Sequence, residues 1–440
     1  MPLDVYEQVG DEIRNALRQY YSAVATPIEA PGKEDFGDVD TLVTGPNTAQ
    51  FDLMSAASSQ VGQRLATALK AKAWVQEKGN PTINLAIPWP SRTNYGNGDE
   101  VLDEKEKYVQ VDVHICRSKK EFEWELFHHA HGDIWNILGT TIRKFGLTAN
   151  DRGLFLRIPE IELYDKKKSM VFLTDEPVKV LRFIGLDEAR WSQRFKSADE
   201  LYKFAAECKM FWVKDSMEDE ESGPALSSYD GTVIVGQEGG ESGKKKLKHN
   251  DRQRMAKRPL FRQWVEEFIP KCREQKLYSH TDITRDNLRE DAFKEFGVQE
   301  EYARKLREWN LLKHNEEIWR DIIKERVPHD DPVLRGASIK MLKAILVECE
   351  EVDGALLKVP TRNNEGFYDT EEVKQFVDEH WETAGRIRLG RTQTKVEEAM
   401  RLKKRPRGQM ICEIGNLRLS TPSWLYICYF NSRIDLANFY

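Results

Sequence analysis

Two aspartates separated by one valine, Asp38 and Asp40, have the residue type and spacing that suit metal chemistry. They follow Gly37 and lead into an apolar run, which predicts a strand with both carboxylates on one face. At a rise of about 3.3 Å per residue, their backbone positions lie about 6.6 Å apart, so the side chains can converge. Converging carboxylates repel each other, and a hard divalent cation with oxygen ligands, such as Mg²⁺, relieves that repulsion.

A third acid is predicted on a second strand. Residues 108–115 alternate strictly between polar and apolar side chains, which predicts a strand that is buried on one face. Asp112 belongs to the polar face, together with Gln110 and His114. An isolated Asp-x-Asp sequence is more often a surface loop than a site, and the second strand is what favours a metal centre of Asp38, Asp40 and Asp112.

The order of these elements resembles the polymerase-beta-like nucleotidyltransferase superfamily. The strand with two acids is followed by a helical stretch over residues 55–76, an apolar strand over residues 83–88 and the strand that carries Asp112. Members of the superfamily carry Gly-Ser, then Asp-x-Asp, then a third Asp on a neighbouring strand. The resemblance covers roughly residues 20–160. It implies an α+β fold with a mixed-sheet nucleotidyltransferase core, followed by a mainly helical domain.

The resemblance also implies a reaction. A nucleoside monophosphate would move from a nucleoside triphosphate to a hydroxyl acceptor, which is an RNA 3′ end, a second nucleotide or a protein hydroxyl. Asp38, Asp40 and Asp112 would be the catalytic residues and would hold two Mg²⁺ or Mn²⁺ ions. Gly37 and the dipeptide Ala25-Thr26 would contribute to nucleotide binding.

The dipeptide Ala25-Thr26 departs from the superfamily pattern, in which Gly-Ser opens a helix and binds phosphates. Thr26 keeps a hydroxyl, but Ala25 adds a methyl group where close approach of the backbone to phosphate favours glycine. The alternative function is therefore a catalytically inactive nucleotidyltransferase-fold protein with a binding or regulatory role. The three retained acids favour the enzyme, because unused clustered carboxylates only cost stability.

Length and composition indicate a protein of several domains. The chain has 440 residues and a net charge of −6, so binding to nucleic acid would require a local basic surface. Residues 1–213 are expected to form the nucleotidyltransferase-like core, in which residues 150–213 either complete the catalytic sheet or bridge to the next domain. Residues 214–250 form an acidic and Gly-rich, then basic, linker or insertion. Residues 251–404 form the helical domain, and residues 405–440 form a tail.

The strongest basic cluster follows the Gly-rich stretch. A solvated run of charge is the more common explanation of such a cluster. The functional alternatives are contact with phosphates or a nucleic acid backbone and a nuclear localisation signal. The candidate contact residues are Lys244, Lys245, Lys246, Lys248, Arg252 and Arg254.

A second metal candidate is the histidine cluster within residues 127–133. His128 and His131 are three residues apart and share a helical face, but Gly132 interrupts the pattern. Hydrogen-bonded histidines at a turn or helix start fit the cluster better than a metal site does.

Cysteine usage and hydropathy bear on the compartment. The six cysteines include no Cys-x-x-Cys pair, which suits a reducing compartment and disfavours a zinc site of thiolates. The sequence has no run of about 20 apolar residues, and its first residues do not resemble a signal peptide. We expect a cytoplasmic or nuclear protein without a membrane partner.

Overall fold

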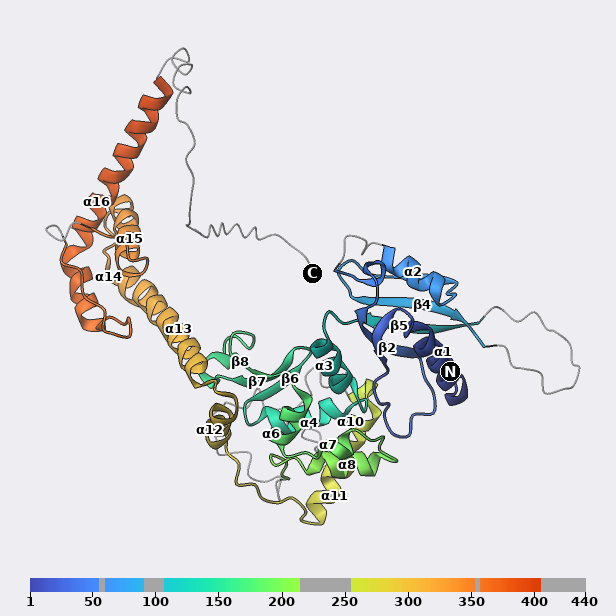
Figure 1. Cartoon of the computed structure of the whole chain (residues 1–440). Helices are drawn as coiled ribbons and strands as arrows, with labels where there is room; N and C mark the ends of the chain where they lie inside the picture. The colour runs from blue at the N-terminus through green and yellow to red at the C-terminus, as the bar shows by residue number, and fades with distance from the viewer. Residues whose placement is uncertain (55–59, 91–106, 214–254, 353–356, 405–440) are drawn as a thin grey trace, which may run out of the picture. The chain divides into compact units, whose positions relative to one another are not determined.

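The computed structural model describes residues 1–54, 60–90, 107–213, 255–352 and 357–404. A mixed sheet lies in the N-terminal part of the chain and a helical part follows it (Figure 1), which confirms the predicted fold class. The chain divides into two compact units, Met1–Trp309 and Asn310–Tyr440. Residues 214–250, expected to form a linker, and the tail at 405–440 lie outside the described residues.

The first unit contains a five-stranded sheet in the order β1-β2-β5-β4-β3. Strands β2 and β5 are parallel neighbours, and the other neighbouring pairs of this sheet are antiparallel. Burial along β5 alternates residue by residue, as its sequence predicts. The strands are β1 (Tyr21–Ala25), β2 (Asp38–Pro46), β3 (Ala73–Val75), β4 (Thr82–Pro88) and β5 (Tyr108–Ile115).

Helices α1 (Leu3–Leu17) and α2 (Val61–Ala68) share one hydrophobic core with the sheet. Apolar residues of α1 recur every three to four positions, so one stripe of the helix is buried against the strands. Val39 of β2 and Val111 of β5 are fully buried in this core. The face of the sheet that these valines occupy is therefore the inner one.

The helix predicted over residues 55–76 is wrong in its extent. Helix α2 ends at Ala68, and Lys70 takes a left-handed φ of 55°, which a continuing helix cannot accommodate. The chain then turns back as β3, which pairs with β4. The ring of Trp74 lies against Gly62 of α2, where any larger side chain would collide with it.

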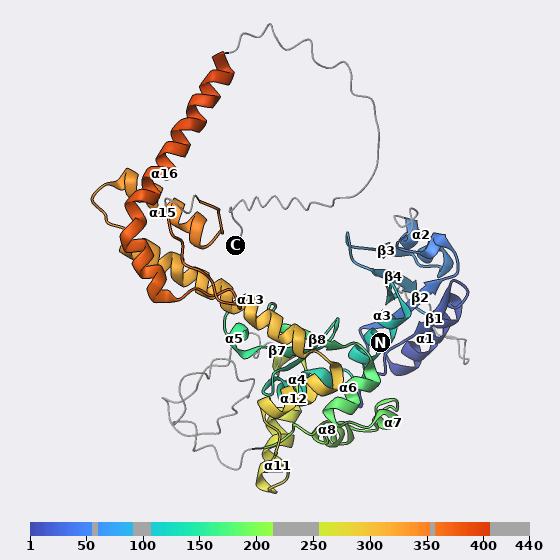
Figure 2. The ribbon, with the colours of Figure 1, turned by 60° about the vertical axis from the view of Figure 1, so that its left-hand side comes forward.

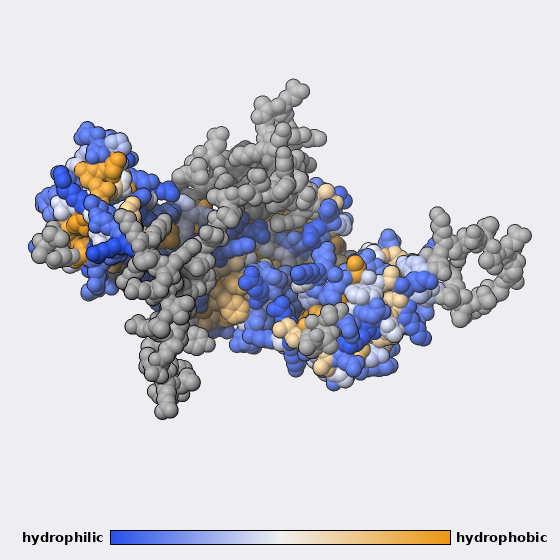
Figure 3. All heavy atoms as spheres, turned by 90° about the horizontal axis from the view of Figure 1, so that it is seen from above, coloured by the Kyte–Doolittle hydropathy of each residue, from blue (hydrophilic) through white to orange (hydrophobic). Residues whose placement is uncertain are grey.

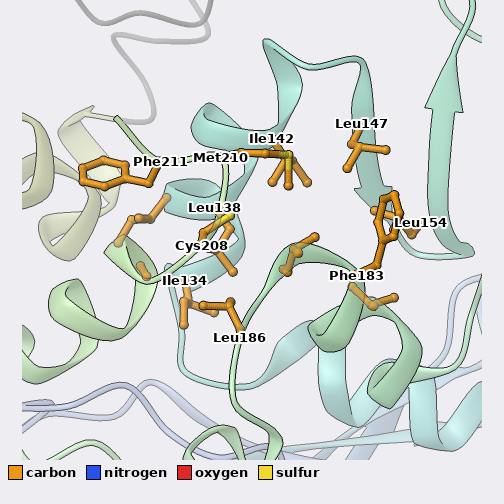
Figure 4. Close-up of a cluster of buried hydrophobic side chains, with 14 of the residues drawn as sticks. Ile134, Leu138, Ile142, Leu147, Leu154, Phe183, Leu186, Cys208, Met210 and Phe211 are labelled. Atoms are coloured by element: carbon orange, nitrogen blue, oxygen red, sulfur yellow. The ribbon is translucent and has the colours of Figure 1, made fainter. Parts of the chain in front are cut away.

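A second, three-stranded sheet of the first unit is separate from the first and has the order β6-β7-β8. Residues 150–213 therefore do not complete the sheet that carries the acids. Figure 4 shows the core beside these strands, with Leu138 and Ile142 of α4 (Ile134–Arg143), Leu154 of β7 and Phe183 of α6 (Pro177–Ile184). The strands are β6 (Leu147–Asn150), β7 (Gly153–Arg157) and β8 (Met170–Thr174).

Helices from two distant stretches of the chain build this second core. Phe261 and Trp264, which follow the undescribed residues 214–254, are buried in the same cluster as Leu138. The helices up to residue 274 are α3 (Lys119–His129), α4 (Ile134–Arg143), α5 (Pro159–Glu162), α6 (Pro177–Ile184), α7 (Glu188–Trp191), α8 (Ala198–Ala206), α10 (Pro259–Gln263), the π-helix η4 (Trp264–Phe268) and α11 (Ile269–Glu274), with the short 3₁₀ helix η1 (Ala49–Phe51) after β2.

The second unit is helical and has its own core, which includes Ile318, Leu342 and Phe376. Helices α15 and α16 approach closely at Gly385, because a Cβ there would lie 2.3 Å from the Ser338 hydroxyl. Helix α12 (Arg285–Phe296) belongs to the first unit, and α13 (Gln299–Glu317) crosses the boundary between the units. The helices that follow are the π-helix η5 (Ile318–Ile323), α14 (Lys324–Arg326), α15 (Pro332–Leu346) and α16 (Thr370–Lys404), coloured from orange to red in Figure 2.

The surface of the described residues is mainly hydrophilic in the view of Figure 3, with smaller apolar areas between the polar ones. None of the described helices combines the length and the apolar character that a membrane span needs.

Candidate metal centre

The three predicted acids, Asp38, Asp40 and Asp112, meet on the outer face of the five-stranded sheet. In the parallel pairing of β2 and β5, Asp40 lies opposite Asp112 and Asp38 lies opposite Gln110. One carboxylate oxygen from each acid lies within 4.8 Å of the other two. Oxygens at this separation can share a single hard cation.

Buried valines on the same two strands hold the acids in this orientation. Val39 lies between Asp38 and Asp40, and Val111 precedes Asp112; both valines are 0% exposed. Because side chains alternate along a strand, a shift of one residue would bury the acids and expose the valines. The hydrophobic core on one face thus fixes the position of the carboxylates on the other.

The acids destabilise one another when no cation is present. The pKa of Asp40 is raised from 3.8 to about 6, first by the loss of surrounding water and then by the negative charges of Asp38 and Asp112. A bound divalent cation would counteract the effect of the Asp38 and Asp112 charges on the pKa of Asp40. The three carboxylates offer oxygen ligands and repel one another, and both features suit a hard cation such as Mg²⁺ or Mn²⁺.

Gln110 orients one of the carboxylates. Its side-chain amide donates to both oxygens of Asp112, at 3.0 and 3.2 Å. The alternation of β5 placed Gln110 on the same face as Asp112, but sequence reasoning gave it no role. The carboxylate oxygens of Asp112 have further lone pairs that do not face Gln110, and these remain available to a cation.

A second negative group, Glu29, lies close enough to Asp40 to contribute to its raised pKa. The Tyr6 hydroxyl donates to one oxygen of Glu29 at 2.6 Å, and the Lys33 ammonium donates to the other at 2.9 Å. Tyr6 also stacks on Phe36, with ring centroids 4.0 Å apart. These contacts tie the segment between β1 and β2 to helix α1.

The dipeptide Ala25-Thr26 lies at the end of β1, beside the strand of acids. Ala25 pairs with Leu42 of β2, and the Thr26 hydroxyl accepts a hydrogen bond from Arg14 at 3.0 Å. The described residues 26–37 form no helix, unlike the segment after Gly-Ser in the superfamily that the sequence resembles. A Cβ added at Gly37 would meet open space, so no close packing requires a glycine there.

The histidine cluster is divided among three environments. His128 lies between the rings of Trp124 and Trp135, and burial lowers its pKa. The His131 ring is hydrogen-bonded at 2.8 Å to the backbone carbonyl of Trp191. In the part of the chain that the structure describes, these histidines do not join any group of three metal ligands.

His129 is the member of the cluster that relates to the acids. Its Nε2 lies 2.8 Å from a Glu125 oxygen, and that hydrogen bond raises the pKa of His129. The charge of His129 in turn acts to lower the pKa of Asp40. The sequence contains the signal for the Glu125–His129 pair, which is their spacing of four on one helix, but not for the proximity to Asp40.

The predicted basic contact residues lie outside the described residues. They are Lys244, Lys245, Lys246, Lys248, Arg252 and Arg254.

Comparison with known proteins adds no family assignment. No protein-family model matches this chain, and no curated protein matches it significantly. The chemistry of the site therefore stands on its geometry, which offers three converging carboxylates for a divalent cation.

Proposed function

We propose that this protein is a metal-dependent nucleotidyltransferase of the polymerase-beta-like type. The observation that carries the proposal is the convergence of Asp38, Asp40 and Asp112 from two adjacent parallel strands. Two acids on one strand and a third on its neighbour are the arrangement that the superfamily pattern implies. A mixed sheet followed by a helical part agrees with the same pattern.

The three acids would hold two Mg²⁺ or Mn²⁺ ions. Bound ions would supply charge stabilisation to the α-phosphate and to the departing pyrophosphate, and would activate the acceptor hydroxyl. The positive charge of a bound ion would offset the part of the raised Asp40 pKa that Asp38 and Asp112 cause, which favours an ionised carboxylate in the working site. Gln110 keeps Asp112 directed towards the other two acids.

The donor in this proposal is a nucleoside triphosphate, and the acceptor is a hydroxyl of an RNA 3′ end, a second nucleotide or a protein. The acceptor hydroxyl gives up its proton to solvent and its oxygen bonds to the α-phosphorus, while the bond from the α-phosphorus to the bridging oxygen breaks and pyrophosphate leaves. The net charge of −6 favours a small acceptor over a long nucleic acid.

An inactive protein that uses the same fold for binding is the second candidate. It is favoured by Ala25 in place of glycine and by the irregular course of residues 26–37, which offers no helix N-terminus to phosphate. Such a protein would bind nucleotide or a partner without releasing pyrophosphate.

Pyrophosphate release separates the two candidates. Wild type, Asp38→Asn and Asp112→Asn are incubated with each of the four nucleoside triphosphates and Mg²⁺ or Mn²⁺, with Glu7→Gln on the exposed side of α1 as the matched control. We expect wild type and Glu7→Gln to turn over equally. The rate of pyrophosphate release should fall by more than about 100-fold in each Asn variant. Loss of an outer-shell partner of a metal alone lowers activity by about 10–100-fold, and a direct ligand should matter more. Folded wild type that releases no pyrophosphate under any of these conditions would favour the inactive candidate.

A further inference from the structure

A hollow of about 380 Å³, whose wall includes residues of α1 and of the segment after β1, is lined by three arginines. Arg14 belongs to α1 and Arg18 directly follows this helix, whereas Arg194 follows α7 in a distant part of the first unit. Thr26 and Glu29, from the segment between β1 and β2, complete the polar part of the wall. Residues far apart in the sequence thus bring guanidinium groups to one place.

The positive charge of this hollow is only partly neutralised. Arg14 forms an ion pair with Asp11, but Arg18 donates to the neutral side chain of Asn15 at 2.6 Å. Arg194 forms no ion pair within the described part of the chain. The negative charge in the wall is Glu29, and Lys33 already compensates it at 2.9 Å. Arg18 and Arg194 therefore leave an excess of positive charge.

The wall of the hollow comes close to Asp40, because two of its residues, Tyr6 and Glu29, interact electrostatically with Asp40. Ala25, which lines it, pairs with Leu42, and Leu42 lies two residues beyond Asp40 on β2. Neighbouring strands are about 4.8 Å apart, so Ala25, the last paired residue of β1, lies close to the part of β2 that carries Asp40. Positive charge beside a carboxylate metal centre is the arrangement expected where phosphate groups extend away from the metals.

We propose that this hollow is a phosphate-binding subsite in which Arg18 and Arg194 hold a multiply charged phosphate group and Arg14 holds Thr26 in place. The planar fork of a guanidinium group matches phosphate oxygens in a bidentate manner. The assignment of the phosphate to a substrate rests on the proposed function. The arginines would supply the charge complementarity that the Ala25-Thr26 segment, without a glycine or a following helix, does not supply.

The phosphate has two candidate sources with the same chemistry. One is the triphosphate of the donor nucleotide, and the other is a phosphate carried by the acceptor. Either source presents oxygens that accept from Arg18 and Arg194. Tripolyphosphate serves as the probe of the shared chemistry, while ATP and AMP distinguish the sources.

The test measures binding of tripolyphosphate to the full chain by isothermal titration in EDTA, without metal. The variant is Arg18→Gln/Arg194→Gln, and Arg262→Gln, an exposed arginine of α10 outside the hollow, is the matched control. We expect the double variant to bind at least tenfold more weakly than wild type, with a smaller salt dependence, and the control to bind as wild type does. Equal affinity in the double variant and the control, or no binding by wild type, would overturn the proposal.

The same titrations with Asp38→Asn/Asp40→Asn separate this proposal from the proposed function. Tripolyphosphate binding should survive in that variant, because it depends on the arginines and not on metal. A donor subsite predicts that Arg18→Gln/Arg194→Gln weakens ATP but not AMP, whereas an acceptor subsite predicts that AMP is weakened as well. Unchanged binding of both nucleotides by the arginine variant would contradict the proposal even if pyrophosphate release had been found.

Discussion

Asp40 of β2 and Asp112 of β5 lie directly opposite each other on neighbouring parallel strands, and both carboxylates face away from the core. With Asp38 they form a cluster of negative charge held in place by the buried valines beneath it. The cluster has consequences for stability, for metal binding and for their dependence on pH.

The first prediction concerns pH and Asp40. Without metal, the folded protein keeps a proton on Asp40 up to about pH 6, whereas the unfolded chain loses it near 3.8. The folded state thus binds more protons between these values, and the free energy of unfolding falls as pH rises from about 4 to 6. Water is lost around the Asp40 carboxylate, but much of the residue remains accessible to solvent, so we expect screening to limit this contribution to about 1 kcal/mol.

Urea unfolding in EDTA at pH 4.5 and pH 7 measures this contribution as a difference between proteins. The free energy of unfolding should fall less between pH 4.5 and pH 7 for Asp40→Asn than for wild type. For Glu7→Gln it should fall as much as for wild type. The same pH dependence in Asp40→Asn and wild type would mean that the pKa of Asp40 is not raised in the folded protein.

The second prediction concerns metal and the stability of the whole site. A cation that binds the folded but not the unfolded chain stabilises it by about 2.7 kcal/mol at 100 times its Kd. Mg²⁺ or Mn²⁺ should therefore raise the Tm of wild type. Asp38→Asn/Asp40→Asn should show no such increase, and in EDTA it should be at least as stable as wild type because repulsion has been removed. A metal-dependent Tm increase of equal size in both proteins would place the cation elsewhere.

The third prediction concerns Gln110, which donates to both oxygens of Asp112. Gln110→Ala should weaken Mn²⁺ binding by about tenfold, the lower end of what a lost outer-shell partner costs. The fold should be unaffected because Gln110 is exposed. Titration of Mn²⁺ into this variant and into Gln50→Ala, an exposed control in the same unit, provides the measurement. Equal weakening in both would deny Gln110 an orienting role.

The fourth prediction concerns Glu162, which anchors the second core of the first unit. Its carboxylate forms ion pairs with Arg157, which is 5% exposed, and with Arg285 at 2.8 Å. Glu162→Ala leaves the Arg157 charge buried without this partner, so we expect a loss of about 3–5 kcal/mol in the free energy of unfolding. Glu160→Ala, an exposed change two residues earlier, should cost less than about 0.5 kcal/mol. Similar losses in urea unfolding of both variants would contradict the structural role of Glu162.

The sequence was sufficient to predict which residues share a face. Side chains alternate with a period of two along a strand, so the positions of Asp38, Asp40 and Asp112 relative to the buried valines followed from local pattern. The mixed sheet and the helical C-terminal part followed from the order of such patterns. Their confirmation by the structure reflects how strictly burial follows alternation in β5.

Contacts between distant segments could not be predicted in this way. The local sequence pattern does not predict that Arg194 lines the same hollow as residues of α1, or that His129 lies near Asp40. Both relationships arise from how separate elements pack. The helix predicted over residues 55–76 was too long for a related reason. Residues 73–75 are apolar enough for either structure, and pairing with β4 decides in favour of a strand.

The number of Mn²⁺ ions bound in the presence of ATP tests the central claim most directly. Electron paramagnetic resonance counts free Mn²⁺ in a titration of wild type and of Asp38→Asn/Asp40→Asn, each with saturating ATP, after subtraction of the ions that ATP binds alone. In a two-metal site one ion is carried by the nucleotide and is removed by this subtraction, so we predict about one additional ion per chain for wild type and its loss in the double variant. The same count in both proteins would contradict the assignment of Asp38, Asp40 and Asp112 as a metal centre.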